Sequence, residues 1–209
     1  MLRLMNNDIE YNKQLIEKYP FLMPYNRWTG EPTKDFDYSY TELIDMPRGW
    51  RIAFGEQMMQ EIKDELIRAE AERTDSPEER QKFADWYRTE RKEDEPDDLL
   101  HIFKFTQIKE KYGSLRAYTN FGTDKIYDII RKYELISEKT CINCGKPATK
   151  ISQGWISPWC DECAKDIHDT FVDVDTFYTP FSDIKEGLEE AIDFTQGNLE
   201  ARVDYVSTD

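Results

Sequence analysis

The stretch Cys141-Ile142-Asn143-Cys144 and its counterpart Cys160-Asp161-Glu162-Cys163 contain all four cysteines of the 209-residue chain, in the spacing C-x2-C-x15-C-x2-C. Each C-x2-C pair can form a tight turn that points two sulfurs at one place, and the fifteen residues between the pairs suffice for a short hairpin. Gly145 follows the first pair, where the turn needs a residue that tolerates a positive φ, and Pro147 ends the turn. The spacing therefore predicts one structural Zn²⁺ held by Cys141, Cys144, Cys160 and Cys163.

Other interpretations of the four cysteines are iron in place of zinc, two disulfides, or two separate redox C-x-x-C pairs. A site closed by four sulfurs leaves no position at which a water could be activated, so its expected role is to hold a small segment together. The chain has two histidines. His168 follows Cys163 by five positions and is a candidate to contact the metal or one of its ligands, whereas the four-cysteine site is the simpler interpretation.

The formal net charge of −15 is unevenly distributed. Residues 161–209 carry 14 acidic against 3 basic side chains, a balance of −11, and the first 160 residues carry 29 against 25, a balance of −4. Four thiolates on one Zn²⁺ would add about two more negative charges. Such a surface repels phosphate, so we expect a basic protein partner and no direct binding of nucleic acid, unless the acidity serves solubility alone.

No apolar run is long enough to span a bilayer, and the first eight residues lack the apolar core of a signal peptide. We therefore expect a cytoplasmic protein with reduced thiols and no contact with membranes. No small-molecule substrate is expected either.

Periodicity predicts an α+β fold in four parts. Residues 1–98 are expected to be mainly helical, with a short helix over 8–19 (Ile9, Leu15, Ile16 and Tyr19 inward), an extended strap over 20–25 and a long helix over about 50–72. In the long helix apolar residues recur every four positions, from Trp50 to Leu66. Ser76-Pro77-Glu78-Glu79 predicts a second helix with a capping box, and the acidic run 93–98 predicts a solvated loop.

Residues 99–138 are expected to form a β-hairpin, with strands over 100–108 and 115–118, and then a helix that Thr123 or Asp124 caps. Residues 139–170 form the predicted zinc ribbon, with a helix after Cys163 that runs to about Thr170. Residues 171–209 form an acidic end packed on the rest, in which Asp183-Ile184-Lys185-Glu186 matches a capping box and Gly197 marks a stop.

The sequence lacks the motifs of the common catalytic sites. A nucleobase deaminase needs H-x-E with P-C-x-x-C, but neither histidine has the glutamate and Trp159 separates Pro158 from Cys160. An HNH-type nuclease needs more histidines, and no G-x-S-x-G, P-loop or G-x-G-x-x-G is present. The sequence predicts a protein that is not an enzyme, although it leaves open a magnesium-dependent nuclease built from carboxylates.

The chain resembles small zinc-ribbon proteins of phages and prophages, and the resemblance covers most of its length. Four features carry it: the runs 20–24 (PFLMP), 47–54 (PRGWRIAF) and 108–116 (IKEKYGSLR), and the ribbon with Gly154-Trp155. The chain is also similar to the metal-binding, acidic kind of phage anti-CRISPR protein that inhibits Cas9. This second resemblance implies a non-enzymatic inhibitor in the cytoplasm of the host bacterium, which binds Cas9 or its guide complex and blocks target DNA loading or activation.

The basic channels in which Cas9 holds nucleic acid suit an acidic partner. The carboxylates expected to mimic phosphate are Asp173, Asp175, Asp183, Glu186, Glu189, Glu190 and Asp193. The alternative is a zinc-ribbon nucleic-acid-binding or transcription accessory protein, whose contacts would be Lys139, Lys146, Lys150, Trp155 and Trp159.

Overall fold

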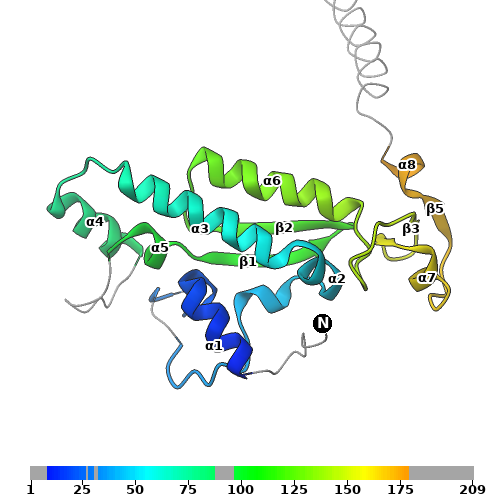
Figure 1. Cartoon of the computed structure of the whole chain (residues 1–209), viewed down its shortest axis with the longest axis horizontal. Coiled ribbons are helices and arrows are strands. Elements are labelled where there is room, and N and C mark those ends of the chain that lie inside the picture. The colour runs from blue at the N-terminus through cyan, green and yellow to red at the C-terminus, as the bar shows by residue number, and fades with distance from the viewer. Residues whose placement is uncertain (1–8, 27, 31–32, 88–96, 179–209) are drawn as a thin grey trace, which may run out of the picture.

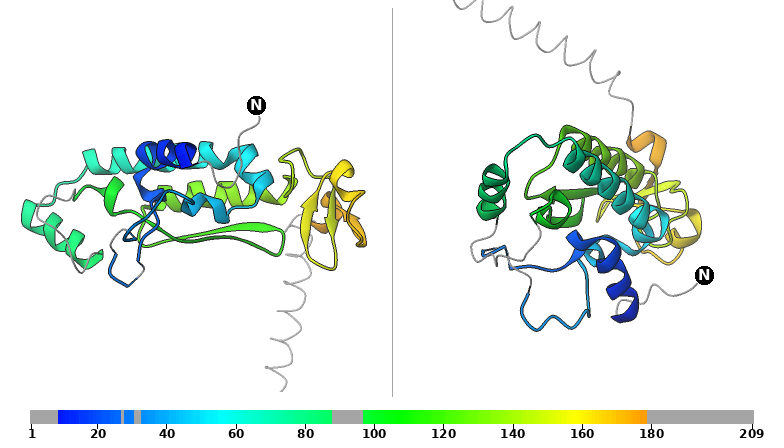
Figure 2. Two further views of the ribbon diagram at one scale, coloured as in Figure 1. Left: turned by 90° about the horizontal axis from the view of Figure 1, so that it is seen from below. Right: turned by 60° about the vertical axis from the view of Figure 1, so that its left-hand side comes forward.

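The structure is a computed structural model that describes residues 9–26, 28–30, 33–87 and 97–178 (Figure 1). It confirms the α+β class: helices pack on a β-hairpin, and a small three-stranded sheet lies at the end of the molecule opposite α4 (Figures 1 and 2). The elements in chain order are α1 (Ile9–Lys18), the 3-10 turns η1 (Pro20–Leu22) and η2 (Glu42–Asp45), α2 (Arg48–Trp50), the π-helical turn η3 (Arg51–Gly55), α3 (Glu56–Ala71), α4 (Pro77–Tyr87), α5 (Leu99–Ile102), β1 (Phe105–Lys111), β2 (Ser114–Thr119), α6 (Asp124–Glu138), β3 (Lys150–Ser152), β4 (Ser157–Trp159), α7 (Asp161–Ala164), β5 (Phe171–Asp173) and α8 (Val174–Phe177).

The predicted long helix is confirmed and begins two residues earlier than expected, because α2, η3 and α3 follow one another without a break. Its apolar stripe, from Trp50 to Leu66 at every fourth position, is at most 4% exposed. Two expectations about the preceding segment are wrong. Ile9 is 47% exposed, since the buried face of α1 is made by Asn12 and Leu15, followed by Tyr19. Residues 20–22 form the 3-10 turn η1 instead of an extended strap.

The predicted capping box at the start of α4 is confirmed. The Ser76 backbone N–H donates to Glu79 Oε2 at 2.8 Å, and the Glu79 N–H donates to Ser76 Oγ at 3.2 Å. The acidic loop expected over 93–98 lies for the most part outside the described residues.

The hairpin is confirmed, with a correction at its start. β1 and β2 pair antiparallel from Lys111↔Ser114 outward, across a two-residue turn in which Tyr112 and Gly113 have φ of 53° and 79°. Two positive φ values are typical of a type I′ turn. Residues 100–102, predicted as strand, instead belong to the short helix α5, because the Asp98 carboxylate accepts the backbone N–H of His101 and caps a helical turn.

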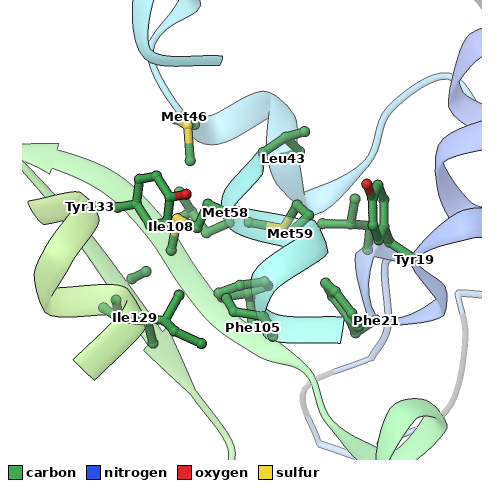
Figure 3. Close-up of a cluster of buried hydrophobic side chains, with 14 of the residues drawn as sticks. Tyr19, Phe21, Leu43, Met46, Met58, Met59, Phe105, Ile108, Ile129 and Tyr133 are labelled. Carbon is green, nitrogen blue, oxygen red and sulfur yellow. The ribbon is translucent and has the colours of Figure 1, made fainter. Parts of the chain in front are cut away.

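One hydrophobic core joins the first two predicted parts of the chain (Figure 3). Met58 and Met59 from α3 meet Ile108 of β1, Ile129 of α6 and Phe21 of η1 in this core. Thr123 caps α6 as predicted, by accepting the backbone N–H of Ile126. The shared core places α6 so that its C-terminal end leads directly to the first cysteine pair. The division of the chain into four parts stays a prediction.

Candidate metal centre

The ribbon is a three-stranded antiparallel sheet in the order β4-β3-β5. The β3–β4 hairpin between the cysteine pairs was predicted, whereas β5 was not. The predicted helix from Cys163 to Thr170 is wrong: α7 ends at Ala164, and the chain turns back to form β5 at Phe171. The Asp169 carboxylate explains the reversal, because it accepts backbone N–H groups from Gly154 at 3.0 Å and from Thr170 at 2.7 Å, and so joins the two ends of the sheet.

The structure brings together the four cysteines that the spacing selects. Their Sγ atoms all lie within 4.8 Å of one another, and Cys144 Sγ lies 3.6 Å from Cys160 Sγ. A tetrahedron with metal–sulfur bonds of about 2.3 Å has edges of about 3.8 Å, so this arrangement fits one tetrahedral ion. His168 is exposed and does not belong to this cluster, which among the described residues consists of the four cysteines.

The thiols are crowded enough to influence one another's ionisation. Burial and neighbouring sulfurs raise the pKa of Cys163 to about 12, although Asn143 Nδ2 donates to its sulfur at 3.4 Å. Burial also acts to raise the pKa of Cys160, but hydrogen bonds from the Cys163 backbone and from the other thiols outweigh it and hold this pKa at about 7. Four thiolates this close to one another repel, and a bound metal cation would balance their charge.

The first cysteine turn is held by the beginning of the long helix. Gly49 N–H donates to Ile142 O at 2.8 Å, and Trp50 Nε1, in the buried core, donates to Thr140 O at 2.9 Å. The backbones are so close that a Cβ on Gly49 would lie 2.2 Å from Cys141 O, and one on Gly145 would lie 2.6 Å from Gly49 O. Two facing glycines thus let the metal site sit directly on the helical core.

Sequence reasoning missed this contact. The available signal was Gly49, a glycine at the start of an otherwise strong helical pattern, which indicates a close backbone approach. The same reasoning located Gly145 correctly, and its φ is 78°.

Each of the three lysines predicted as nucleic-acid contacts is engaged by a carboxylate of the same unit. The pairs are Lys139 with Asp175 at 3.8 Å, Lys146 with Glu162 at 2.9 Å and Lys150 with Asp161 at 3.0 Å. The two tryptophans are also engaged at their ring nitrogens: Trp155 Nε1 donates to Glu110 Oε2 at 3.3 Å and Trp159 Nε1 donates to Ser152 Oγ at 3.1 Å. The Trp155 ring remains 73% exposed.

Two of the seven carboxylates predicted to contact a partner lie in the described part of the chain. Asp173 ends β5 and is exposed, and the side chain of Asp175 on α8 is 95% exposed. Asp183, Glu186, Glu189, Glu190 and Asp193 lie outside the described residues, as do the predicted capping box and helix stop of the acidic end.

Among the described residues, no helix has both the length and the apolar character needed to cross a bilayer. No protein-family model, curated protein or solved structure matches the chain.

Proposed function

We propose that this protein is a non-enzymatic binding protein, stabilised by one structural Zn²⁺, whose acidic surface contacts a basic protein. The partner to test first is a Cas9-type effector. The observation that carries the proposal is that the three lysines expected to attract phosphate, Lys139, Lys146 and Lys150, are each paired with a carboxylate, while carboxylates remain in excess.

Zinc is the metal that the donor set favours. Four cysteine sulfurs at tetrahedral spacing suit Zn²⁺, which has no redox chemistry and forms closed structural sites of this kind. Iron can also accept four thiolates, so metal analysis of the purified protein decides between them. When bound, the ion would link the turn packed on Gly49 to the start of α7, where Cys160 and Cys163 lie.

The charge of the ribbon supports a basic partner. Residues 139–178 contain four basic and six acidic side chains, a balance of −2. A Zn(Cys)4 centre adds about two negative charges and brings the unit to about −4. This charge repels a phosphate backbone and attracts the arginines and lysines with which Cas9 holds its guide duplex and target DNA.

In this proposal Asp173 and Asp175 are the described part of the contact surface, and the five carboxylates from Asp183 to Asp193, which lie outside the described residues, are proposed as further contacts. These carboxylates bind arginines and lysines of the effector that target DNA would otherwise contact. As a result the DNA is not loaded, or the effector does not rearrange. No bond is made or broken by this chain.

The test combines metal analysis with a cleavage reaction. The protein should contain one zinc per chain, and it should lower cleavage and target binding by guide-loaded Cas9 while the guide RNA stays intact. Asp173→Lys with Asp175→Lys should weaken inhibition without changing zinc content. The matched control is Glu78→Lys with Asp85→Lys, two exposed positions on α4 at the other end of the molecule, which should inhibit like the unmodified protein.

The competing function is binding of nucleic acid, which the exposed Trp155 ring favours because a base can stack on it. A gel shift with DNA or RNA that weakens steeply with salt would support this function and oppose ours. Magnesium-dependent loss of guide or target would indicate a carboxylate nuclease instead. Unchanged cleavage at saturating protein would remove Cas9 as the partner and leave the basic partner to be identified by pull-down.

A further inference from the structure

A pocket of about 400 Å³ lies by α4 and α5, at the end of the molecule opposite the ribbon (Figure 1). This volume is within the range of small-molecule sites, about 300–1,000 Å³. Its walls are aromatic, because Tyr25, Trp28, Trp86 and Tyr87 all line it. The pocket is therefore separate from the metal centre and has its own chemistry.

The two tryptophans of this pocket are presented to solvent by ordered backbone. Trp28 is 92% exposed and Trp86 is 82% exposed. Asn26 Oδ1 accepts the Trp28 N–H at 2.9 Å, and the Gly30 N–H donates to Asn26 O at 2.8 Å, so a closed turn carries the first indole. The last turn of α4 carries the second. Large apolar rings that are held in water beside a hollow are typical of a binding site.

The polar side of the pocket is also held in place. Lys104 and Thr106 lie at the start of β1, where the alternation of a strand turns them away from the buried Phe105. Asn120 joins the two ends of the hairpin: its Oδ1 accepts the Lys104 N–H at 2.8 Å, and its Nδ2 donates to Ile102 O at 2.9 Å. The pocket is therefore largely preformed, as ligand sites usually are.

The charge of the lining differs from that of the whole chain. Lys104 is the one charged side chain among the described residues that line the pocket, and no carboxylate is among them. In the whole chain, acidic residues outnumber basic ones by 43 to 28. The Lys104 ammonium also donates to Pro20 O at 3.5 Å, which holds it at the edge of the core. An aromatic pocket with one ammonium fits a planar ring that carries an anionic group.

We infer that this pocket binds a nucleoside monophosphate, either as a free nucleotide or as the phosphorylated end of a single strand. The base stacks on the indoles of Trp28 and Trp86, and the phosphate is bound by Lys104. The hydroxyls of Tyr25 and Thr106 can form hydrogen bonds with the edge of the base or with the sugar.

The lining disfavours other ligands. A free amino acid brings an ammonium group, for which the pocket offers no carboxylate among the described residues. A nucleoside triphosphate carries several negative charges, and one lysine does not balance them. A proline-rich peptide, which aromatic grooves also bind, has no group for the lysine to recognise. A single phosphate on a planar base matches both the walls and the charge.

The net charge of −15 limits how much nucleic acid can extend beyond the bound nucleotide, because each further phosphate is repelled. We therefore expect a free mononucleotide to bind at least as tightly as a strand.

Calorimetric titration of the full-length, zinc-loaded protein with AMP tests the inference. AMP should bind once per chain with a Kd below about 1 mM. Trp28→Ala and Trp86→Ala should each weaken binding at least about fivefold, because each removes one stacking surface. Both side chains are exposed, so neither variant should change Tm.

Lys104→Gln should weaken AMP binding at least about tenfold but leave adenosine binding unchanged, because adenosine has no phosphate. The matched control is Trp155→Ala, which removes a similarly exposed indole at the ribbon and should bind AMP like the unmodified protein.

Absence of saturable binding by both AMP and UMP up to about 10 mM would overturn the inference. Two other results would do the same: equal affinity for AMP and adenosine, and an AMP affinity that survives replacement of both Trp28 and Trp86 by alanine.

A short single strand with a terminal phosphate distinguishes the two sources of the ligand. If it binds more tightly than AMP and loses this affinity in Trp86→Ala, the pocket takes the end of a strand. If it binds no more tightly than AMP, the ligand is a free nucleotide. Cas9 is absent from these titrations, so each result is independent of whether Cas9 is inhibited.

Discussion

Replacing Gly49 by alanine is the sharpest test of how the metal site is held. The new Cβ would lie 2.2 Å from Cys141 O and 2.6 Å from Ile142 O, and both are backbone atoms that cannot rotate away. The helix start and the cysteine turn would have to separate by about 1 Å, at an overpacking cost of about 1–3 kcal/mol. The Gly49–Ile142 and Trp50–Thr140 hydrogen bonds would weaken as well, each worth about 1 kcal/mol.

The free energy of unfolding should therefore fall by about 3–4 kcal/mol, which lowers Tm by about 10 °C for a chain of this size. Metal affinity should weaken by about tenfold, because Cys141 is no longer held in position. The assays are calorimetry and zinc competition with a chromophoric chelator.

The matched control is Gly55→Ala, in the π-helical turn of the same helix. Its Cβ would meet Arg51 Cβ at 3.5 Å and Leu43 Cδ1 at 3.7 Å, which are ordinary contacts. Gly55 has helical φ and ψ, so alanine should stabilise the protein by about 0.5–1 kcal/mol. An unchanged Tm and zinc affinity in Gly49→Ala would refute the argument that this glycine contact holds the metal site.

Three further perturbations follow from the structure. Cys160→Ser should unfold the ribbon, and so should removal of the metal by a strong chelator. Most of the helical circular dichroism should remain, because the hydrophobic core is built from residues that precede the ribbon. One zinc per chain in the variant would contradict the four-ligand site. Glu65→Ala should lower stability by about 2 kcal/mol at pH 7, because the buried carboxylate accepts from Arg68 at 2.6 Å and from the α6 cap Thr123 at 2.8 Å. These donors, Arg68 first, hold the pKa of Glu65 below its usual range. The contribution of Glu65 to the free energy of unfolding is therefore complete above about pH 4.3 and is lost as pH falls through the folded-state pKa. In acid, the stability of the variant should converge on that of the unmodified protein. Gly113→Ala should cost about 1–2 kcal/mol in thermal unfolding, because φ is 79° and Ile156 lies 3.2 Å from the new Cβ, and an unchanged Tm would count against the turn assignment.

Local rules predicted the elements whose cause is local. The apolar repeat from Trp50 to Leu66, the capping box at Ser76 and the cap at Thr123 each depend on residues within one or two turns of the chain. The same holds for the cysteine turns, because a C-x2-C spacing and the glycine after it specify their own geometry.

The misassigned elements depend on contacts across the chain, joined at residues 100–102 by a local cap. β5 exists because Asp169 ties the end of the ribbon to Gly154 and brings Phe171 beside Ser152. Residues 100–102 have the composition of a strand, but a cap at Asp98 and packing on the core made them helical. Propensity alone could not resolve such competition between a local preference and tertiary contacts.

The sequence by itself determined the α+β class, the long amphipathic helix, the hairpin and the four residues able to bind a metal, since periodicity and spacing are properties of short segments. Only the tertiary structure decided that the site rests on Gly49 and that Lys139, Lys146 and Lys150 are paired with carboxylates. Those facts depend on which distant backbones and side chains approach one another within a few ångströms, and no rule of spacing along the chain encodes that distance.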